Sequence, residues 1–529
     1  MYSNYHFKGL PLSDEQSMCL ELFSNMNFDE TLGIQAGAGA SKTFTANAIA
    51  ALVMPNCRGL YLAYNSVIVE EVRKQFPRYV DVTTTHGLAY KYVGRHYKDR
   101  LVGKLTIKVY LKVAKPIDAH GLITPQAFAA SVMKTVNNYC LSQDMKISTK
   151  HVALPKSNVR KEDATAFLSE KVAIAANELW LELVNPKGSL PITHDVYLKM
   201  FVLKMAQNKL SLPYEYVMLD EAQDTAPIAQ QLMHLLTNSK KVAVGDKHQS
   251  IYEWRGADNA MAHLNFSKEG KLTTCYRFGQ SIADLANDLL NHHLSADVSF
   301  KGNPNKESNI ITDTSKSLAT PNRLVLCRTN AMLFSEMMKS LNRGEKPYLL
   351  KDPNALFTTL KGIEQLKAGY TPTESAELSN FSSWGELKEH ANSQIGNDYL
   401  PLIKAIDEYG ISSLTKSVES VTNQSKGQAD IVLSTAHASK GAEADHVVLA
   451  SDFDYYMNGA DIEDSEVNLL YVALTRAKNT LDVAQCNALR RLVKNEGNTS
   501  IAKQASTNEI VQQVAKRNPA LERLNLLLS

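Results

Sequence analysis

The sequence contains no long hydrophobic run. No apolar stretch of 18 or more residues occurs in its 529 residues, and the first residues lack the apolar centre of a signal peptide. A secreted or membrane-inserted protein is therefore not expected, and we expect a soluble, intracellular, cytoplasmic chain. Hydrophobic residues make up 44% of the sequence, which is enough for a sizeable core divided among three or four domains or subdomains.

Paired cysteines and an excess of charge are also missing. The cysteines lack CxxC spacing, so they fit reduced thiols better than disulfides or a zinc site. The net charge of +2 says nothing about nucleic acid, because phosphate binding needs only a local basic track. One such track occupies residues 91–115, where eight Lys or Arg residues and three tyrosines occur with a single acid, Asp99. The six cysteines are Cys19, Cys57, Cys140, Cys275, Cys327 and Cys486.

Within that track, residues 104–113 alternate between apolar and polar side chains. The alternation predicts a half-buried strand, with Lys104, Lys108 and Tyr110 among the residues of its outer face. Two interpretations of this face remain open. The lysines either protect a solvated strand from aggregation or form one wall of a DNA channel.

Short apolar runs, each followed by a loop and a helix, indicate parallel α/β sheets. The runs Thr31–Ala36 and Gly59–Tyr64 precede the predicted helices Lys42–Met54 and Asn65–Phe76. Acidic or glycine residues follow several of the runs, at the edge where open α/β sheets bind ligands. The other predicted strands are Tyr216–Leu219, Lys241–Val244, Arg323–Cys327, Ile431–Ser434 and His446–Ala450.

A loop of small residues between the first strand and helix is a candidate phosphate-binding loop. Its backbone N–H groups would surround phosphates, Lys42 would reach the β and γ phosphates, and the Thr43 hydroxyl would bind magnesium. Ala36 and Ser41 replace both glycines of the GxxxxGK[ST] pattern, and the alternative is a loop that only packs a helix against a strand. The loop consists of Ala36, Gly37, Ala38, Gly39, Ala40, Ser41, Lys42 and Thr43.

Two adjacent acids follow the apolar run Tyr216–Leu219. At the end of a buried strand, Asp220 would hold magnesium while Glu221 orients or deprotonates the attacking water. Adjacent acids are common on protein surfaces. It is their position after a strand, together with the small-residue loop, that predicts phosphoryl transfer.

The ordered set of motifs resembles the superfamily 1 helicases of the UvrD/Rep/PcrA group, and within it the helicase part of the F-box DNA helicases. The similarity runs from Leu12 to about Lys478, and the residues before Leu12 contain no apparent F-box. Besides the loop and the acids, the matching segments are Leu12–Gln16, Leu62–Asn65, Thr83–Tyr90, Val244–Ala257, Cys275–Phe278, Ser434–Glu443 and Leu469–Lys478.

This resemblance implies an α/β fold with two RecA-like parallel-sheet P-loop NTPase cores, each with a mainly helical inserted subdomain. The first core would comprise residues 1–90 and 206–300, with 91–205 inserted. The second core would comprise residues 301–355 and 426–490, with 356–425 inserted. Residues 491–529 would form a helical tail.

The resemblance also implies roles around ATP. Gln16 would read the adenine edge and Tyr276 would stack on the adenine ring. Gln249 would sense the γ-phosphate, and Glu443 would touch the ribose or the γ-phosphate.

Two arginines would act as arginine fingers, Arg277 and Arg476, the latter reaching over from the second core. An arginine finger contributes on the order of 10³–10⁵ in rate, so hydrolysis would be fast only when both cores close on ATP. The alternative for each arginine is a surface salt bridge, which contributes little.

Single-stranded DNA is expected to stack on Trp254, since base–aromatic stacking tolerates any sequence. The alternative is a tryptophan of the core. For His86 and His437 the alternative is a histidine with a purely structural role. The other residues that match strand-contacting positions are Tyr64, Asn65, Thr84, His86, Arg255 and His437.

The function implied is a 3′–5′ single-stranded DNA translocase and helicase that uses ATP and Mg²⁺ to unwind duplexes in replication, repair or recombination. The polarity comes from the resemblance alone. Partners would be single-stranded DNA, single/double-strand junctions and replication or recombination proteins, with no membrane. Two alternatives remain: a translocase that removes bound proteins with little unwinding, and a nucleic-acid-binding protein whose nucleotide site is weakened by Ser41.

Overall fold

The computed structural model describes residues 5–493 with internal gaps, and the chain divides into two compact units, Met1–Thr274 and Cys275–Ser529. Each unit contains its own parallel sheet. The gaps are residues 104, 106–109, 111–122, 124, 155–161, 253–258, 297–298, 314–321, 351–352, 373–374, 376–377, 380, 392–398, 423 and 459–461.

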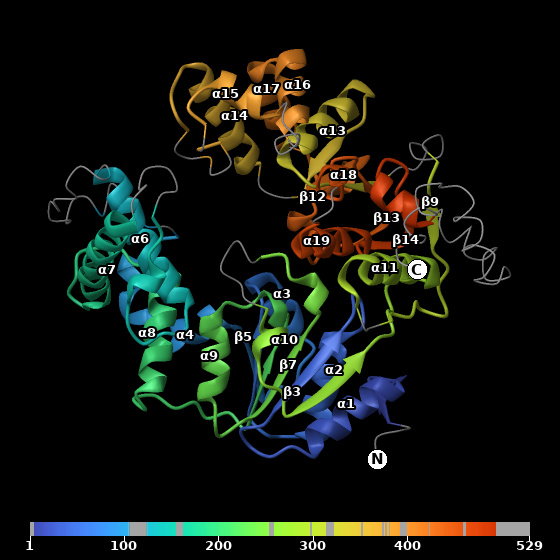
Figure 1. The fold of residues 1–529 in the computed structure, drawn as a ribbon. Helices are drawn as coiled ribbons and strands as arrows, with labels where there is room; N and C mark the ends of the chain where they lie inside the picture. The colour runs from blue at the N-terminus through green and yellow to red at the C-terminus, as the bar shows by residue number, and fades with distance from the viewer. Residues whose placement is uncertain are drawn as a thin grey trace, which may run out of the picture. The chain divides into compact units, whose positions relative to one another are not determined.

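The first unit is built on a six-stranded parallel sheet in the order β5-β4-β6-β7-β3-β8 (Figure 1). A short antiparallel hairpin, β1 (His6–Phe7) and β2 (Leu10–Pro11), precedes it. The strands of the sheet are β3 (Thr31–Ala36), β4 (Gly59–Ala63), β5 (Val80–Thr84), β6 (Tyr216–Leu219), β7 (Lys240–Gly245) and β8 (Lys268–Leu272).

Helices cover both faces of this sheet because successive strand residues point to opposite sides. On β4, Leu60 and Leu62 join one buried cluster, whereas Tyr61 and Ala63 join the other. The Tyr61 face packs against α1 (Asp14–Ser24), α2 (Lys42–Ala48, continued by a π-helical turn, Ile49–Val53) and α3 (Ser66–Arg73). The opposite face packs against α4 (Thr85–Tyr92), α8 (His194–Ala206), α9 (Pro227–Leu235) and the short α10 (Ala260–His263).

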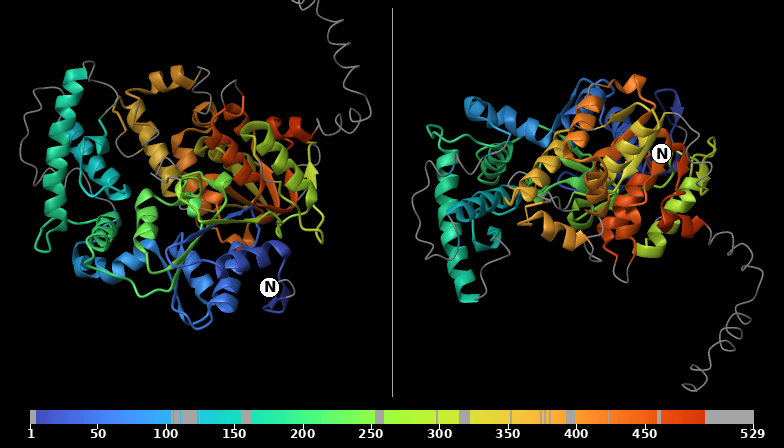
Figure 2. Two further views of the ribbon diagram at one scale, coloured as in Figure 1. Left: turned by 60° about the horizontal axis from the view of Figure 1, so that its bottom comes forward. Right: turned by 90° about the horizontal axis from the view of Figure 1, so that it is seen from above.

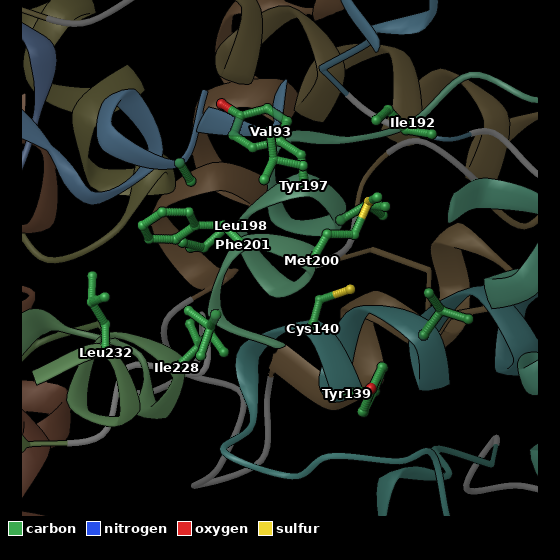
Figure 3. Packing of buried hydrophobic residues seen from close by; sticks show 14 of the residues in the cluster. Val93, Tyr139, Cys140, Ile192, Tyr197, Leu198, Met200, Phe201, Ile228 and Leu232 are labelled. Atoms are coloured by element: carbon green, nitrogen blue, oxygen red, sulfur yellow. The ribbon is translucent and has the colours of Figure 1, made fainter. Parts of the chain in front are cut away.

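Two further helices, α6 (Pro125–Leu141) and α7 (Glu162–Val184), lie to one side of the first sheet, beyond α8 and α4 (Figures 1 and 2). Tyr139 and Cys140 of α6 share one buried cluster with Phe201 of α8 and with Leu232 of α9 (Figure 3). The helical insertion therefore continues the core of the first unit.

The two ends of this insertion are tied together at its base. Leu101 forms an isolated parallel bridge with Ile192, through Val102 N–H to the Ile192 carbonyl (3.0 Å) and Ile192 N–H to the Arg100 carbonyl (2.8 Å). The Arg100 guanidinium donates to the carbonyls of Leu183, Asn185 and Leu190, at 3.2, 2.6 and 2.7 Å. Arg100, one of the basic track's residues, thus closes the end of α7.

The second unit contains another six-stranded parallel sheet, in the order β11-β12-β10-β13-β14-β9. Its strands are β9 (Asn309–Ile311), β10 (Arg323–Cys327), β11 (Pro347–Leu349), β12 (Ile431–Thr435), β13 (Ala444–Leu449) and β14 (Ala477–Asp482). Its helices are α11 (Gln280–Leu294), α13 (Asn330–Asn342), α14 (Asn354–Lys367), α15 (Trp384–Ala391), α16 (Leu400–Tyr409), α17 (Ile411–Thr422), α18 (Phe453–Tyr456) and α19 (Asp464–Leu474).

The predicted α/β class and the two parallel sheets are confirmed. Strands β6 and β10 match their predicted bounds at both ends. The contact division falls after Thr274, so α11, which the sequence assigned to the first core, lies in the second unit and packs against α19. The other domain boundaries stay predictions. Of the predicted tail, residues 491–529, the structure describes only 491–493.

The predicted strand at 104–113 is wrong where the structure describes it. Tyr110 is helical and 5% exposed, although the alternation placed it on a solvated outer face. Leu105 has no regular secondary structure, and the other residues of this segment lie outside the described ranges. Packing of Tyr110 into the core of the insertion overrides the period-2 pattern.

Candidate nucleotide and nucleic-acid sites

The small-residue loop joins β3 to the N-terminus of α2. Its Gly37 N–H donates to the Leu272 carbonyl at 3.0 Å, which anchors the loop to β8. Gly39 and Ser41 both have left-handed backbone conformations, with φ of 70° and 59°. The glycine that the standard pattern has at position 41 would adopt this conformation without strain, whereas a serine Cβ is strained there. Serine in place of glycine at position 41 therefore adds backbone strain to the loop.

Lys42 meets the acidic pair at the carboxyl edge of the first sheet. Its ammonium lies 2.7 Å from Glu221 Oε1, and the two side chains are 13% and 21% exposed. Burial alone would lower the pKa of Lys42, but the carboxylates of Glu221 and Asp220 raise it. The lysine is therefore a fixed cation at the position where the loop would hold phosphates.

Asp220 is the more buried acid, at 4% exposure. The Tyr61 hydroxyl donates to its Oδ2 at 2.6 Å, and the Glu221 N–H donates to its Oδ1 at 3.0 Å. Burial, followed by the neighbouring Glu221 charge, raises the pKa of Asp220 to about 6, and Lys42 opposes this shift. Asp220 is thus held in one orientation by a hydrogen bond on each of its carboxylate oxygens.

A magnesium ion fits these residues by the chemistry of their donors. The Tyr61 hydroxyl, which donates to Asp220, is also a hydrogen-bond partner of the Thr43 side chain. The Thr43 hydroxyl and the Asp220 carboxylate therefore lie around one tyrosine oxygen. Hydroxyl and carboxylate oxygens are the hard ligands that magnesium prefers alongside nucleotide phosphates.

A chain of hydrogen bonds links Glu221 to Gln249. Gln223 Nε2 donates to Glu221 Oε2 (2.5 Å), and Gln223 Oε1 accepts from the Asp246 N–H (3.0 Å). The Asp246 carboxylate in turn accepts from Gln249 Nε2 (2.8 Å). No role was assigned to Gln223 or Asp246 from the sequence, although Asp246 directly follows β7 and precedes Gln249 by three residues, a position that could have revealed it.

Gln16, the predicted adenine reader, is 3% exposed and lies in the first turn of α1. Its Oε1 accepts from the Ser13 N–H at 3.0 Å, and the Ser13 hydroxyl accepts from the Gln16 N–H at 3.2 Å. This reciprocal capping fixes the start of α1. Adenine recognition by Gln16 stays a prediction.

In the second unit the structure brings Arg277 and Glu443 together. Arg277 Nε donates to Glu443 Oε2 at 2.8 Å, and Nη1 donates to the Thr475 carbonyl, also at 2.8 Å. The neighbouring Tyr276 is 39% exposed. These residues come from segments that are 166 and 198 positions apart in the sequence.

Arg476 is 2% exposed, so the surface salt bridge considered for it is wrong. Its Nε donates to the Val472 carbonyl at 2.8 Å, and its Nη2 donates to the Thr475 hydroxyl at 3.2 Å. A guanidinium fixed on backbone and hydroxyl oxygens at the end of α19 is pre-organised. Its role toward ATP stays a prediction.

Several predicted DNA-contacting residues lie where β4 and β5 end. Asn65 and Thr84 cap α3 and α4, accepting from the Ile68 N–H and the Gly87 N–H, both at 2.9 Å. Tyr64 stacks on Tyr252, with ring centroids 5.8 Å apart and planes at 13°. Sequence reasoning did not single out Tyr252, although it lies two residues before Trp254 in the same matched segment.

The remaining predicted DNA contacts divide into two groups. His86 Nε2 lies 2.9 Å from Asp195 Oδ1, and His437 begins a 3₁₀ turn after β12. The His86 contact fits the structural role that was its alternative, but it leaves the side chain 43% exposed. Trp254 and Arg255 lie outside the described residues.

Two family descriptions match this chain. The UvrD/REP helicase N-terminal domain matches residues 22–269, and the UvrD-like helicase C-terminal domain matches residues 374–488. Together they span more than half of the chain. No helix among the described residues has the length and apolar character needed to cross a bilayer.

Curated relatives include two F-box DNA helicases. F-box DNA helicase protein 1 of Schizosaccharomyces pombe is 29% identical over 527 residues, covering 91% of this chain and 58% of that protein. F-box DNA helicase 1 of Gallus gallus is 27% identical, covering 85% of this chain and 47% of that protein. This chain thus spans about half the length of these relatives.

A shorter match, 33% identical over 133 residues, is to the ATP-dependent DNA helicase PcrA of Staphylococcus epidermidis, covering 24% of this chain and 16% of that protein. Among solved structures, the PRRSV helicase aligns with a TM-score of 0.31 at 10% identity, over 85% of this chain and 51% of that chain. That likeness is too weak to support an argument.

Proposed function

Because the chain belongs to the UvrD/Rep family of superfamily 1 ATP-dependent DNA helicases, we propose that it is a 3′–5′ single-stranded DNA translocase that unwinds duplexes. The observation that carries this proposal is the contact of Lys42 with Glu221 beside Asp220. A phosphate-binding lysine, a magnesium-binding acid and an acid for the attacking water are the groups that phosphoryl transfer from ATP requires.

Each residue of the first unit has a defined task in this proposal. Lys42 and the loop N–H groups bind the triphosphate, and Thr43 and Asp220 hold Mg²⁺, which supplies charge neutralisation at the phosphates. Glu221 orients the water and accepts its proton. When the triphosphate arrives, it competes with Glu221 for the Lys42 ammonium, so nucleotide binding frees the carboxylate for its role as base.

Gln249 connects this chemistry to DNA. The hydrogen-bond chain through Gln223 and Asp246 runs from Glu221 to the segment that leads into Tyr252. Tyr252 stacks on Tyr64, a predicted strand contact. A change at the γ-phosphate that moves Gln249 would therefore alter the surface on which bases stack.

The second unit would supply Arg277 and Arg476 to the transition state and Glu443 and Tyr276 to the nucleotide. Arg277 must exchange Glu443 for phosphate when it acts, and the Glu443 side chain is 46% exposed, which leaves room for that exchange. Single-stranded DNA and single/double-strand junctions are the proposed substrates.

A second candidate is a nucleic-acid-binding protein with a weakened nucleotide site. The left-handed backbone at Ser41 favours it, because the strained residue lies next to Lys42. Lys42 contacts Glu221, and the Glu221 N–H donates to Asp220, so the three groups stay together, which favours the active enzyme.

The test measures phosphate release with and without single-stranded DNA, then unwinding of 3′-tailed and 5′-tailed duplexes. We expect DNA-stimulated hydrolysis and unwinding from the 3′ tail, both lost in Lys42→Ala. An equal rate of hydrolysis with and without single-stranded DNA would contradict the proposed motor function. Unwinding from the 5′ tail alone would reverse the polarity, and displacement of bound proteins without unwinding would favour a translocase that clears single strands.

A further inference from the structure

Tyr61 is the central residue of β4, next to the edge strand β5, and its hydroxyl reaches the proposed magnesium ligand Asp220. It is fully buried on β4, and its ring packs on Phe76 with centroids 4.7 Å apart. The hydroxyl donates to Asp220 Oδ2 at 2.6 Å and is also a partner of the Thr43 side chain. Three elements, β4, α2 and the end of β6, therefore meet at one oxygen.

We propose that Tyr61 is a positioning residue that sets the magnesium affinity of this site. The inference rests on the proposed function, since it concerns the same ion. Asp220 has two restraints, the Tyr61 hydroxyl on Oδ2 and the Glu221 N–H on Oδ1. The first of these ties Asp220 to β4, at a hydroxyl that also interacts with the Thr43 side chain. Without it the carboxylate and the threonine hydroxyl are no longer held in register for one ion.

The pattern of strand β4 explains why this residue can act there. Tyr61 shares its face of the sheet with α2, whereas Leu60 and Leu62 point to the other face. A phenylalanine would fill the same volume and keep the Phe76 contact while removing only the hydroxyl. Tyr61→Phe therefore removes the role in ligand positioning and keeps the role in core packing.

The experiment compares Tyr61→Phe with wild type in two measurements. The first is binding of a fluorescent ADP analogue with and without Mg²⁺, and the second is the Mg²⁺ concentration that gives half-maximal hydrolysis. Loss of a residue that orients a metal ligand typically lowers metal affinity about 10–100-fold. We expect a rise of about 10-fold in the Mg²⁺ requirement, with Mg²⁺-free nucleotide binding unchanged.

Tyr79→Phe is the matched control. It removes a tyrosine hydroxyl that donates to the Ala50 carbonyl at 3.1 Å, in the same core but away from the site. We expect a wild-type Mg²⁺ requirement for it, and a cooperative melting transition for both variants, which shows that each is folded. A wild-type Mg²⁺ requirement in Tyr61→Phe would overturn the inference. A wild-type protein that binds no nucleotide would instead overturn the proposed function.

A second feature, independent of the first, is a groove of about 420 Å³ beside the edge strand β5. Arg73 of α3, Arg78 of the α3–β5 loop and Lys91 of α4 line it, and all three side chains are exposed. The one acid in its lining, Asp81, accepts from the Tyr214 hydroxyl at 2.7 Å and lies 3.7 Å from Lys91. The groove therefore has an excess of positive charge.

We infer that this basic groove binds the phosphate backbone of nucleic acid, as an additional contact of the proposed helicase. Arg73 is partly committed to the protein, since it donates to the Val82 carbonyl at 2.9 Å. Arg78 would bind phosphate directly, and Lys91 would exchange its 3.7 Å contact with Asp81 for a phosphate. The groove continues along β5 toward Thr84, a predicted strand contact, so a nucleic acid bound there extends the same path.

The test is the salt dependence of DNA binding by Arg78→Ala/Lys91→Ala, measured without nucleotide. Each phosphate contact contributes about 0.7–0.9 to the slope of log affinity against log salt. We expect the slope to fall by about 1.5, whereas Lys271→Ala, on the opposite edge strand β8, leaves it nearly unchanged. A wild-type slope in the double variant would overturn this inference alone. A wild-type protein that does not bind DNA would overturn the proposed function.

Discussion

Helices α2 and α13 each follow a parallel strand, one in each unit, and their N-termini have different partners. At α2, which follows β3, the cap residue Ser41 makes no side-chain hydrogen bond to the first turn of the helix. At α13, after β10, the Asp452 carboxylate accepts from the Arg328 N–H at 3.0 Å and from the Thr329 N–H at 2.8 Å.

A helix N-terminus favours an anion, and a protein can supply that anion from a ligand or from its own chain. In the first unit the proposed function gives this position to phosphate. In the second unit the Thr329 hydroxyl caps α13 by accepting from the Met332 N–H at 3.1 Å, and the fully buried Asp452 carboxylate accepts from the two N–H groups just before the helix. Two sheets of the same size and strand direction therefore differ in what lies at this helix start, an internal carboxylate in one and a small-residue loop in the other, which fits the proposal that the second unit supplies arginines and the first the phosphate loop.

Removal of Arg476 is expected to have the largest effect. If the second unit acts only in the transition state, Arg476→Ala lowers the hydrolysis rate about 10³-fold or more and leaves nucleotide affinity near wild type. Stopped-flow measurement gives the nucleotide affinity, and steady-state phosphate release gives the hydrolysis rate. Arg343→Ala, which breaks only the pair with Glu345 in the same unit, is the control. Equal loss of binding and hydrolysis would contradict the division of roles.

Lys42→Ala is expected to reduce both the nucleotide affinity and the hydrolysis rate. The lysine contacts phosphates in the ground state and in the transition state, so we expect nucleotide affinity to fall and hydrolysis to fall about 10²–10³-fold. The same two assays apply. Retained tight nucleotide binding would show that the loop N–H groups alone hold the triphosphate, and would weaken the contrast between α2 and α13.

Asp452 makes the second unit sensitive to pH. Burial raises its pKa to about 6 from an ordinary value of about 3.9, so between these pH values the folded state binds a proton that the unfolded chain has lost. This group's contribution to stability is full below about pH 4 and disappears as pH rises through 6, by about 2–3 kcal/mol.

Asp452→Asn removes that titration. We expect the unfolding free energy of wild type, minus that of the variant, to decrease from pH 4 to pH 6.5 in denaturant titrations. Parallel curves for the two proteins would show that the carboxylate at α13 is not the titrating group.

Ser41→Gly should have the smallest effect. Relief of the left-handed strain is expected to raise the unfolding free energy by about 1 kcal/mol. Ser66→Gly, in the first turn of α3, is the matched control and should lower it slightly, since glycine is a poor helix former. Thermal melting measures both. Destabilisation by Ser41→Gly would mean that the serine side chain makes a contact worth more than the strain.

Local patterns predicted the parts of the fold and site that are local in sequence. The apolar run at Tyr216–Leu219 and the two acids after it were visible because strand and carboxylates are adjacent. Edge strand β8 was missed because Lys268–Leu272 is mostly polar and becomes a strand only by pairing with β3. Tyr61 was not assigned a role because its partner Asp220 is 159 residues away.

The same reason explains Asp452, whose partners Arg328 and Thr329 precede it by more than 120 residues. Contacts between side chains so far apart in the sequence depend on which strands lie next to each other in the sheet. The apolar pattern of a single strand does not predict that order. The resemblance to a family supplied Arg277 and Glu443 as separate roles, and only the structure joins them as a pair.

The bridge between Leu101 and Ile192 has a consequence for how the insertion has changed in evolution. Its entry and exit points are neighbours, so the chain between them can lengthen or shorten without moving β5 or α8, as long as the helices that share their core are kept. Natural variation in chain length is therefore expected to accumulate between residues 103 and 189, outside the helices that pack against α8 and α9.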